Sequence, residues 1–304
     1  MIYAMLACAP TYANLAPLQP SELWTPWPVK HVDVDGVDVA YVDSGGPGEP
    51  IVFVHGLSSY LGFWEYQLDH FAKDHRVLAL DLPGYGASAR PDAPYTPPWY
   101  AEVCAGFAEA LSLDRATWVG HSMGGQIVMT LALAHPERVE RMVLAAPAGF
   151  EELAPGAGRF LKRWWHERRA MEATPDEVRA NFLTMVFNRH DASVERLIAE
   201  RVRLGKSEAF RGTSVAVARS VAGMIDHPVR ERLGEIAAPT LVVFGTDDRM
   251  IPNPVFNGGA TSAVAREGAA RIPHASLVLV PGAGHTVFHD APEAFNRAME
   301  EFLR

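Results

Sequence analysis

Cysteine and long apolar runs are both scarce in this chain. Only two cysteines, Cys8 and Cys104, occur in 304 residues, too few for a disulfide framework or a cysteine-rich zinc site. No apolar run approaches the roughly 20 residues that cross a bilayer. Positive charge is also in deficit, because 27 Lys and Arg face 36 Asp and Glu for a formal charge of −9. This balance argues against non-specific nucleic-acid binding, which needs a basic surface.

Two common ligand-binding motifs are also missing. His166-Glu167 lacks the second histidine of the zinc motif H-E-x-x-H, so we expect no metal site. The glycine-rich turn at residues 45–48 lacks the Lys-Ser/Thr of a phosphate-binding loop. With 48% hydrophobic and 21% charged residues, the chain has the composition of a globular protein with a sizeable core.

The first residues leave the compartment open. Residues 1–9 are apolar and no Lys or Arg precedes Lys30, whereas a secretory signal has a positive start and a longer apolar stretch. One interpretation is an apolar tail on a protein that is cytoplasmic by default. The other is the end of a truncated lipoprotein signal, which would export the chain or anchor it to lipid through Cys8. Residues 1–28 are expected to form an N-terminal tail with an extended, proline-rich end.

Short apolar strands alternate with helical patterns along most of the chain. Two alternating segments, 29–35 and 37–43, flank the hairpin signal Asp35-Gly36. Further strands are expected at 51–54, 76–80, 116–119, 139–144, 240–244 and 276–280, the last five each after a helical pattern. This order predicts an α/β fold with a mostly parallel central sheet flanked by helices.

One long segment interrupts this alternation, because no strand is expected between Leu144 and Thr240. Thr174 to Glu177 forms a capping box with Pro at the first helical position, and helical patterns follow at 194–204 and 214–225. We therefore expect an all-helical insertion at residues 151–232 within a core formed by 29–150 and 233–304. The insertion carries 15 basic and 12 acidic side chains, so the rest of the chain has a net charge of −12.

A candidate nucleophile follows the strand expected at 116–119. Gly120-His121-Ser122-Met123-Gly124 matches G-x-S-x-G and leads directly into a helical pattern. Such a strand-turn-helix context exposes a serine hydroxyl on a sharp turn, at the positive end of the helix dipole. Ser122 is therefore the predicted nucleophile.

A serine nucleophile needs a base, and the base needs an orienting acid. The carboxyl ends of later strands lead into Asp247-Asp248 and into Gly282-Ala283-Gly284-His285. The chain order serine, acid, histidine is that of one hydrolase architecture. We expect His285 as the base and Asp248, rather than its neighbour Asp247, as the acid.

An oxyanion needs preorganised donors near the nucleophile. The backbone amide of Met123, directly after Ser122, is expected to be one of them. The second is expected from the loop after residues 51–54, where Gly56 permits a tight turn that aims the Leu57 amide. His55 is interpreted as a structural member of this loop.

From about Val29 onward the chain resembles enzymes of the α/β-hydrolase fold. The resemblance rests on five motifs, in order: His55-Gly56, residues 81–88, 120–125, 245–252 and 282–285. It implies that the helical insertion, placed after the sixth core strand, is a cap over the active site. It also implies structural roles for Asp81 and Ser88. The sharp strand-to-helix turn that carries Ser122 is called the nucleophile elbow. Ser122 disfavours the dehalogenases and epoxide hydrolases, which have Asp at this elbow.

The expected function is hydrolysis of small carboxylic esters or lactones through an acyl-enzyme, without a cofactor. Carbon–carbon hydrolases of ring-cleavage products and cofactor-free haloperoxidases resemble the chain at the elbow and stay open as alternatives. A ligand receptor on a hydrolase fold is the non-enzyme alternative. The expected partner is a small ester-like molecule, with no nucleic acid and no transmembrane span, and the oligomeric state stays open.

Aromatic and methionine side chains of the insertion are candidates for the substrate pocket. Their helical spacing predicts one apolar face, which would cover the top of the sheet near Ser122. Such side chains suit an adaptable apolar slot. The six candidates are Phe160, Trp164, Trp165, Met171, Phe182 and Met185.

Overall fold

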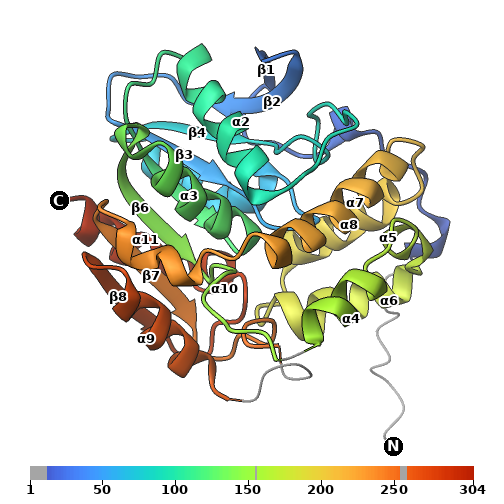
Figure 1. Cartoon of the computed structure of the whole chain (residues 1–304). Helices are drawn as coiled ribbons and strands as arrows, with labels where there is room; N and C mark the ends of the chain where they lie inside the picture. The colour runs from blue at the N-terminus through green and yellow to red at the C-terminus, as the bar shows by residue number, and fades with distance from the viewer. Residues whose placement is uncertain (1–11, 155, 254–258) are drawn as a thin grey trace, which may run out of the picture.

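A single eight-stranded sheet forms the centre of the molecule (Figure 1). The computed structural model describes residues 12–154, 156–253 and 259–304. The strand order is β1-β2-β4-β3-β5-β6-β7-β8, with β1–β2 and β2–β4 antiparallel and the other pairs parallel. The predicted α/β fold is confirmed, and each strand lies within two residues of its predicted position. The strands are β1 (Lys30–Val34), β2 (Val37–Asp43), β3 (Pro50–Val54), β4 (Arg76–Leu80), β5 (Ala116–His121), β6 (Val139–Ala145), β7 (Thr240–Gly245) and β8 (Ala275–Val280).

Both faces of the sheet are buried, which explains why its central strands are apolar at nearly every position. In β3, Val52 and Val54 join the hydrophobic cluster on one face, whereas Ile51 and Phe53 join the cluster on the other. The first cluster includes α2 (Pro97–Ala110), α3 (Met123–Ala134) and α9 (Thr261–Arg271), and the second includes α1 (Glu65–Phe71) and α11 (Pro292–Leu303).

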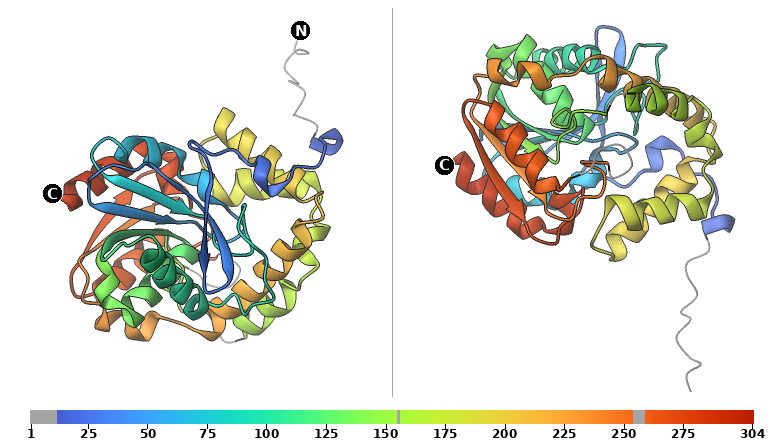
Figure 2. Two further views of the ribbon diagram at one scale, coloured as in Figure 1. Left: turned by 90° about the horizontal axis from the view of Figure 1, so that it is seen from above. Right: turned by 60° about the horizontal axis from the view of Figure 1, so that its bottom comes forward.

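Between β6 and β7, the described residues form helices and turns without a strand, as predicted. Both views of Figure 2 show these helices gathered at one end of the sheet. They contact the loops after β3, β4 and β8, at the carboxyl ends of the parallel strands. The helices are α4 (Ala157–Trp164), α5 (Arg169–Glu172), α6 (Pro175–Asn181) with a π-helical turn (Phe182–Val186), α7 (Ala192–Leu204) and α8 (Phe210–Asp226).

The predicted start of α6 is confirmed in detail. The Thr174 hydroxyl accepts a hydrogen bond from the Glu177 amide at 3.2 Å, and the Glu177 carboxylate accepts one from the Thr174 amide at 2.8 Å. The helical spacing of Phe160, Trp164, Trp165 and Met171, which precede this point, predicts one continuous helix. The structure instead has two helices there, α4 and α5, and the backbone leaves the helical region between them at Trp165 (φ −87°, ψ 58°).

Residues 12–28 are attached to the inserted helices. The Leu18 amide donates to the Arg203 carbonyl, and the Trp24 amide donates to the Glu200 carboxylate, both at 3.2 Å. The Trp24 ring also lies 4.2 Å from the guanidinium carbon of Arg196. The part of the expected tail that is described is therefore bound along α7. Cys8, on which the lipid-anchor interpretation depends, lies outside the described residues.

No helix among the described residues is long and apolar enough to span a membrane. The second cysteine, Cys104, is fully buried in α2. Burial raises the pKa of its thiol to about 12, because a thiolate is poorly solvated in an apolar interior. Cys104 is therefore a packing residue of the core.

Candidate active site

Ser122 occupies a strained turn between β5 and α3. Its backbone has φ 51° and ψ −117°, a region that a residue with a side chain rarely adopts. Three hydrogen bonds hold it there: its amide donates to the Ala145 carbonyl at 3.1 Å, and its carbonyl accepts from the amides of Gln126 and Ala148 at 3.2 and 2.9 Å. This is the geometry that presents a serine hydroxyl at the carboxyl edge of a sheet.

Glycines allow the backbone to close tightly around this turn. A Cβ on Gly124 would stand 2.4 Å from the Val54 carbonyl oxygen, and one on Gly120 would stand 2.5 Å from the Gly124 oxygen. A Cβ on Gly56 would lie 3.3 Å from the Cβ of Ser122. The loop after β3 therefore packs directly on the elbow, which brings the next residue, Leu57, to its edge.

His285 and Asp248 form a buried pair. His285 Nδ1 lies 2.9 Å from Asp248 Oδ2, and the two residues are 3% and 7% exposed. The other carboxylate oxygen, Oδ1, accepts the amides of Met250 and Ile251 at 2.7 and 3.0 Å. Asp247 is instead exposed and accepts a hydrogen bond from Thr246. Of the two neighbouring carboxylates, the structure pairs Asp248 with His285.

His121 connects this pair to the elbow. Its Nε2 donates to the His285 carbonyl at 3.2 Å, and the two imidazole rings are 4.7 Å apart. Burial, with a smaller effect from the neighbouring His285, holds the pKa of His121 well below its usual range. A neutral His121, directly before Ser122, therefore packs between the elbow and the His285 loop.

One predicted oxyanion donor, the amide of Met123, follows Ser122 directly in the chain, and the other, the amide of Leu57, lies in the loop that packs on the elbow. The Met123 amide is at the first position of α3, where the N–H groups of a helix have no partner within the helix. Neither the Met123 nor the Leu57 amide is paired with an acceptor among the described residues. Both donors are therefore available to a bound oxygen.

The interpretation of His55 as a structural residue agrees with its contacts. Its Nδ1 donates to the Gly56 carbonyl at 2.8 Å, and its Nε2 accepts the Leu82 amide at 3.0 Å. Burial lowers the pKa of His55 to about 4. A neutral imidazole with both nitrogens occupied fixes the loop that carries Leu57.

Asp81 and Ser88 likewise stabilise neighbouring segments by accepting hydrogen bonds from backbone amides. The Asp81 carboxylate accepts the amides of Leu61 and Ala87, both at 2.7 Å, and the Ser88 hydroxyl accepts the Ala40 amide at 2.8 Å. Burial raises the pKa of Asp81 to about 6.

Asp290 is a residue of this region that sequence reasoning missed. Its carboxylate accepts the amide of Gly284 at 2.7 Å, and those of Asn188 and Arg189 at 3.0 and 2.9 Å. It therefore ties the loop that carries His285 to the helical insertion. No local pattern marks this carboxylate, since two of its partners lie about 100 residues away in the chain.

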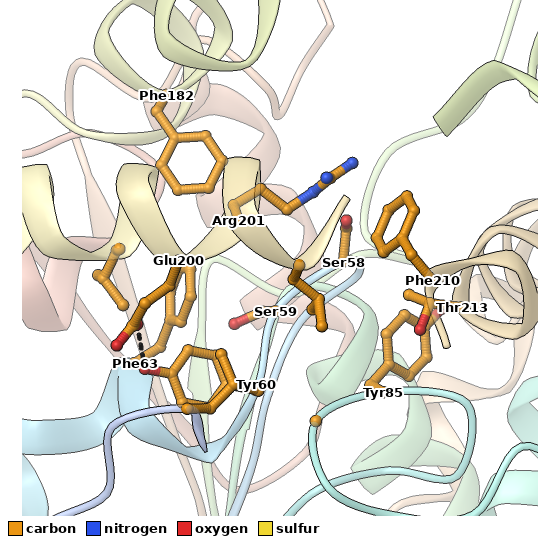
Figure 3. Close-up of a pocket in the computed structure, with 14 residues that line it drawn as sticks. Ser58, Ser59, Tyr60, Phe63, Tyr85, Phe182, Glu200, Arg201, Phe210 and Thr213 are labelled. Atoms are coloured by element: carbon orange, nitrogen blue, oxygen red, sulfur yellow. Dashed lines mark hydrogen bonds between the residues drawn. The ribbon is translucent and has the colours of Figure 1, made fainter. Parts of the chain in front are cut away.

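A narrow cavity lies between α7, α8 and the loops after β3 and β4 (Figure 3). It holds about 20 Å³ of solvent space, roughly the room that one water needs. Its wall includes the apolar side chains of Phe63, Phe182 and Phe210, and Ser58 next to Leu57. Of the six predicted pocket residues, Phe182 lines this cavity.

Arg201, which sequence reasoning did not single out, projects into this cavity from α7 (Figure 3). Its guanidinium carbon lies 4.2 Å from the centre of the Phe210 ring, and Nη2 donates a long bond of 3.4 Å to the Ala170 carbonyl. Burial lowers its pKa to about 10. Among the described residues, no carboxylate lies within 4 Å of it, whereas six of the other twelve arginines of the insertion have one. Arg201 is therefore a largely buried cation without a carboxylate partner among the described residues.

Three predicted pocket residues lie at the outer surface instead. Phe160, Trp164 and Met171 are 52%, 48% and 48% exposed, so their assignment to the pocket is corrected. The reason is the orientation of α4, whose inner face carries Gly158, packed on Ile225 of α8.

The other two candidates are half-buried. Trp165 packs against the core cluster that contains α2 and α3. Met185 lies in the π-helical turn and does not line the cavity that contains Phe182.

A wider groove of about 560 Å³ runs along the other side of the elbow. It is bounded by α4 and α8, and it reaches Gln126 and Ala148, whose amides bind the Ser122 carbonyl. No group of three or more potential metal ligands occurs among the described residues.

Comparison with known proteins defines the class. Residues 49–292 match the family model of the alpha/beta hydrolase fold, so the chain belongs to the α/β-hydrolase family. It is an enzyme with hydrolase activity. A curated relative, the 2-hydroxy-6-oxononadienedioate/2-hydroxy-6-oxononatrienedioate hydrolase of Burkholderia vietnamiensis, is 29% identical over 299 residues, covering 90% of this chain and 95% of the relative.

Solved structures give the same class. A probable hydrolytic enzyme from Pseudomonas aeruginosa superposes with a TM-score of 0.85 at 25% identity, covering 95% of this chain and 99% of that one. The enol-lactonase from Burkholderia xenovorans superposes with a TM-score of 0.73 at 25% identity, covering 90% and 99%.

Proposed function

We propose that this hydrolase cleaves carboxylic esters or lactones with Ser122 as nucleophile, His285 as base and Asp248 as orienting acid. The observation that carries the proposal is the strained elbow at Ser122 beside the buried Asp248–His285 pair. Similarity to an enol-lactonase supports the bond type.

The hydrogen bond from His285 Nδ1 to Asp248 fixes the tautomer in which Nε2 is the acceptor. Nε2 then takes the proton of the Ser122 hydroxyl while Oγ attacks the carbonyl carbon. The amides of Leu57 and Met123 stabilise the oxyanion of the tetrahedral intermediate. His285 returns the proton to the leaving alkoxide, which leaves an acyl-enzyme that water hydrolyses by the same steps.

The inserted helices act as a cap in this proposal, and the groove along the elbow receives the acyl group. Its walls include the aliphatic side chains of Leu161, Val221, Met224 and Ile225, and each buried methylene contributes about 0.8 kcal/mol, roughly a fourfold gain in kcat/KM. Activity should therefore rise from acetate to butyrate esters. The gain should end at medium chain length, when the groove is filled.

Turnover of p-nitrophenyl esters by the wild type and by Ser122→Ala tests the nucleophile. Ser122→Ala should abolish turnover and also labelling by a fluorophosphonate probe. Ser59→Ala is the matched control, since Ser59 is a buried serine of the neighbouring loop whose hydroxyl has no partner among the described residues. Undiminished labelling of Ser122→Ala would refute the assignment.

Arg201 favours a second candidate function, the cleavage of a carbon–carbon bond in a substrate that carries a carboxylate. A desolvated cation without a counter-ion is costly, and a bound carboxylate would compensate it. The Burkholderia vietnamiensis relative is named for dicarboxylate substrates.

Paired substrates separate the two candidates. A carboxylate-bearing dienoate ketone and a neutral ester are compared in the wild type, Arg201→Met and Arg201→Lys. A charge-assisted bond contributes about 1.5–3 kcal/mol, so Arg201→Met should raise KM for the ketone by roughly 10- to 100-fold, with partial rescue by Lys. If the wild type hydrolyses esters but not the ketone, the second candidate is refuted.

A further inference from the structure

The exposed large apolar side chains of the described residues gather in one place. They are Phe160 and Trp164 of α4 and Met171 of α5, each about half exposed. The rings of Phe160 and Trp164 are stacked, with centroids 6.1 Å apart and planes 13° from parallel. We call the outer face of residues 156–172 the α4–α5 patch. Large exposed apolar groups that cluster in this way mark an interaction surface.

The α4–α5 patch is also the basic part of an acidic molecule. Residues 156–172 carry five Lys and Arg against only Glu167 and Glu172, while the remainder of the chain has a net charge of −12. Lys162 is paired with Asp226, at 2.6 Å. Among the described residues, no carboxylate lies within 4 Å of Arg163 or Arg168. Their charges are therefore available to an external partner.

One of the basic side chains is combined directly with an aromatic ring. The Arg169 guanidinium carbon lies 4.9 Å from the centre of the Trp164 ring. Aromatic side chains interleaved with arginine and lysine on a short surface helix are typical of helices that lie in the headgroup layer of a bilayer. An acidic protein partner would match the charge, but it would not require three apolar side chains at half exposure around it.

We propose that the α4–α5 patch docks on the surface of an anionic lipid bilayer. Phe160, Trp164 and Met171 would enter the boundary between headgroups and acyl chains, while the arginines would bind lipid phosphates. The acidic remainder of the molecule would be repelled by the same surface, which would orient the protein with this patch toward the lipid.

Docking in this orientation would bring the groove along the elbow close to the bilayer surface. The inner side of α4 contributes Gly158 and Leu161 to that groove, which extends to Ala148 beside Ser122. One helix therefore forms both the docking surface and a wall of the groove. Docking would place the groove beside the headgroup layer, where amphiphilic substrates are concentrated.

Co-sedimentation of the full-length chain with vesicles tests the proposal. The vesicles are pure phosphatidylcholine, or phosphatidylcholine with about one-third phosphatidylglycerol. The wild type should bind the anionic vesicles, with roughly a fivefold contribution from each basic residue. Arg163→Glu/Arg168→Glu should lower the partition coefficient at least tenfold, and Phe160→Ser/Trp164→Ser should have a similar effect.

The matched control is Arg266→Glu/Arg297→Glu, which reverses two exposed arginines on α9 and α11, outside the patch. It should change binding by less than twofold. Arg163→Glu/Arg168→Glu should keep the wild-type turnover of a soluble ester, which shows that it is folded. The proposal is overturned if both patch variants bind like the wild type, since another segment would then hold the protein on the vesicle. It is equally overturned if neutral vesicles bind as well, or if the patch mediates only self-association in sedimentation velocity.

Discussion

Asp248→Asn is the sharpest single test of the proposed triad. Asp248 Oδ1 accepts two backbone amides, from Met250 and Ile251, and Oδ2 faces His285 Nδ1 at 2.9 Å. An asparagine in this place keeps the amide bonds through its carbonyl oxygen and therefore turns its NH₂ group toward His285. Nδ1 must then accept a hydrogen bond, which moves the ring proton to Nε2. In that tautomer His285 has no lone pair for the Ser122 proton.

The expected loss is large because the variant removes the base function while the fold stays intact. A wrong imidazole tautomer in a serine triad lowers kcat by about 10⁴-fold, which corresponds to about 5 kcal/mol of transition-state free energy. Asp247→Asn is the matched control. The Asp247 side chain is exposed and accepts a hydrogen bond from the Thr246 hydroxyl, so the kcat of Asp247→Asn should stay within about twofold of the wild type.

The assay is kcat for p-nitrophenyl butyrate at neutral pH, with the thermal unfolding midpoint measured for each variant. The midpoint of Asp248→Asn should stay close to that of the wild type, since volume and amide bonds are conserved. A kcat for Asp248→Asn within tenfold of the wild type would refute the tautomer argument. A larger loss for Asp247→Asn would transfer the acid role to Asp247.

Three further variants test the parts that support the site. In urea unfolding, the loss of unfolding free energy caused by His55→Gln should be about 3 kcal/mol smaller at pH near 4 than at pH near 7. Burial lowers the pKa of His55 from 6.5 to about 4, so the wild type itself loses that stability as the pH falls through this range. An equal loss of free energy at both pH values would contradict this prediction. Asp290→Asn should lower kcat roughly 10- to 100-fold with little change in KM, because the Gly284 amide loses its carboxylate partner and the His285 loop shifts; a wild-type kcat would show that the clamp is dispensable. Gly124→Ala should lower the free energy of unfolding by about 3 kcal/mol, since its Cβ would stand 2.4 Å from the Val54 oxygen; an unaltered denaturation midpoint would refute the close approach.

The fold was predictable from the sequence because its signals are local. A strand buried on both faces is apolar at nearly every position, and the central strands of this sheet show that pattern wherever the chain enters the core. The capping box at Thr174 and the G-x-S-x-G at Ser122 are also complete within a few residues. Strand order within the chain then brings the segments that follow β5, β7 and β8 to one edge of the sheet.

The contacts of neighbouring candidates became visible only in the tertiary structure. Asp248 was expected over the adjacent Asp247, and the path of the loop after β7 turns Asp248 toward His285. In α4, the exposed residues Phe160 and Trp164 and the inward residue Leu161 are all apolar. Periodicity cannot select the inner face when both faces are apolar, and the packing of α4 on α8 decides it.

Arg201 and Asp290 could not be found from the sequence at all, for one physical reason. The environment of a partly buried charge is set by its neighbours, and these neighbours come from distant parts of the chain. The cavity around Arg201 combines α7 with loops more than 100 residues earlier, and Asp290 binds amides about 100 residues before it. The sequence by itself determined the sheet, the elbow and the chemistry carried by short motifs. Which charges are desolvated, and which side chains face the substrate, was decided by the packing of the helical insertion on the core.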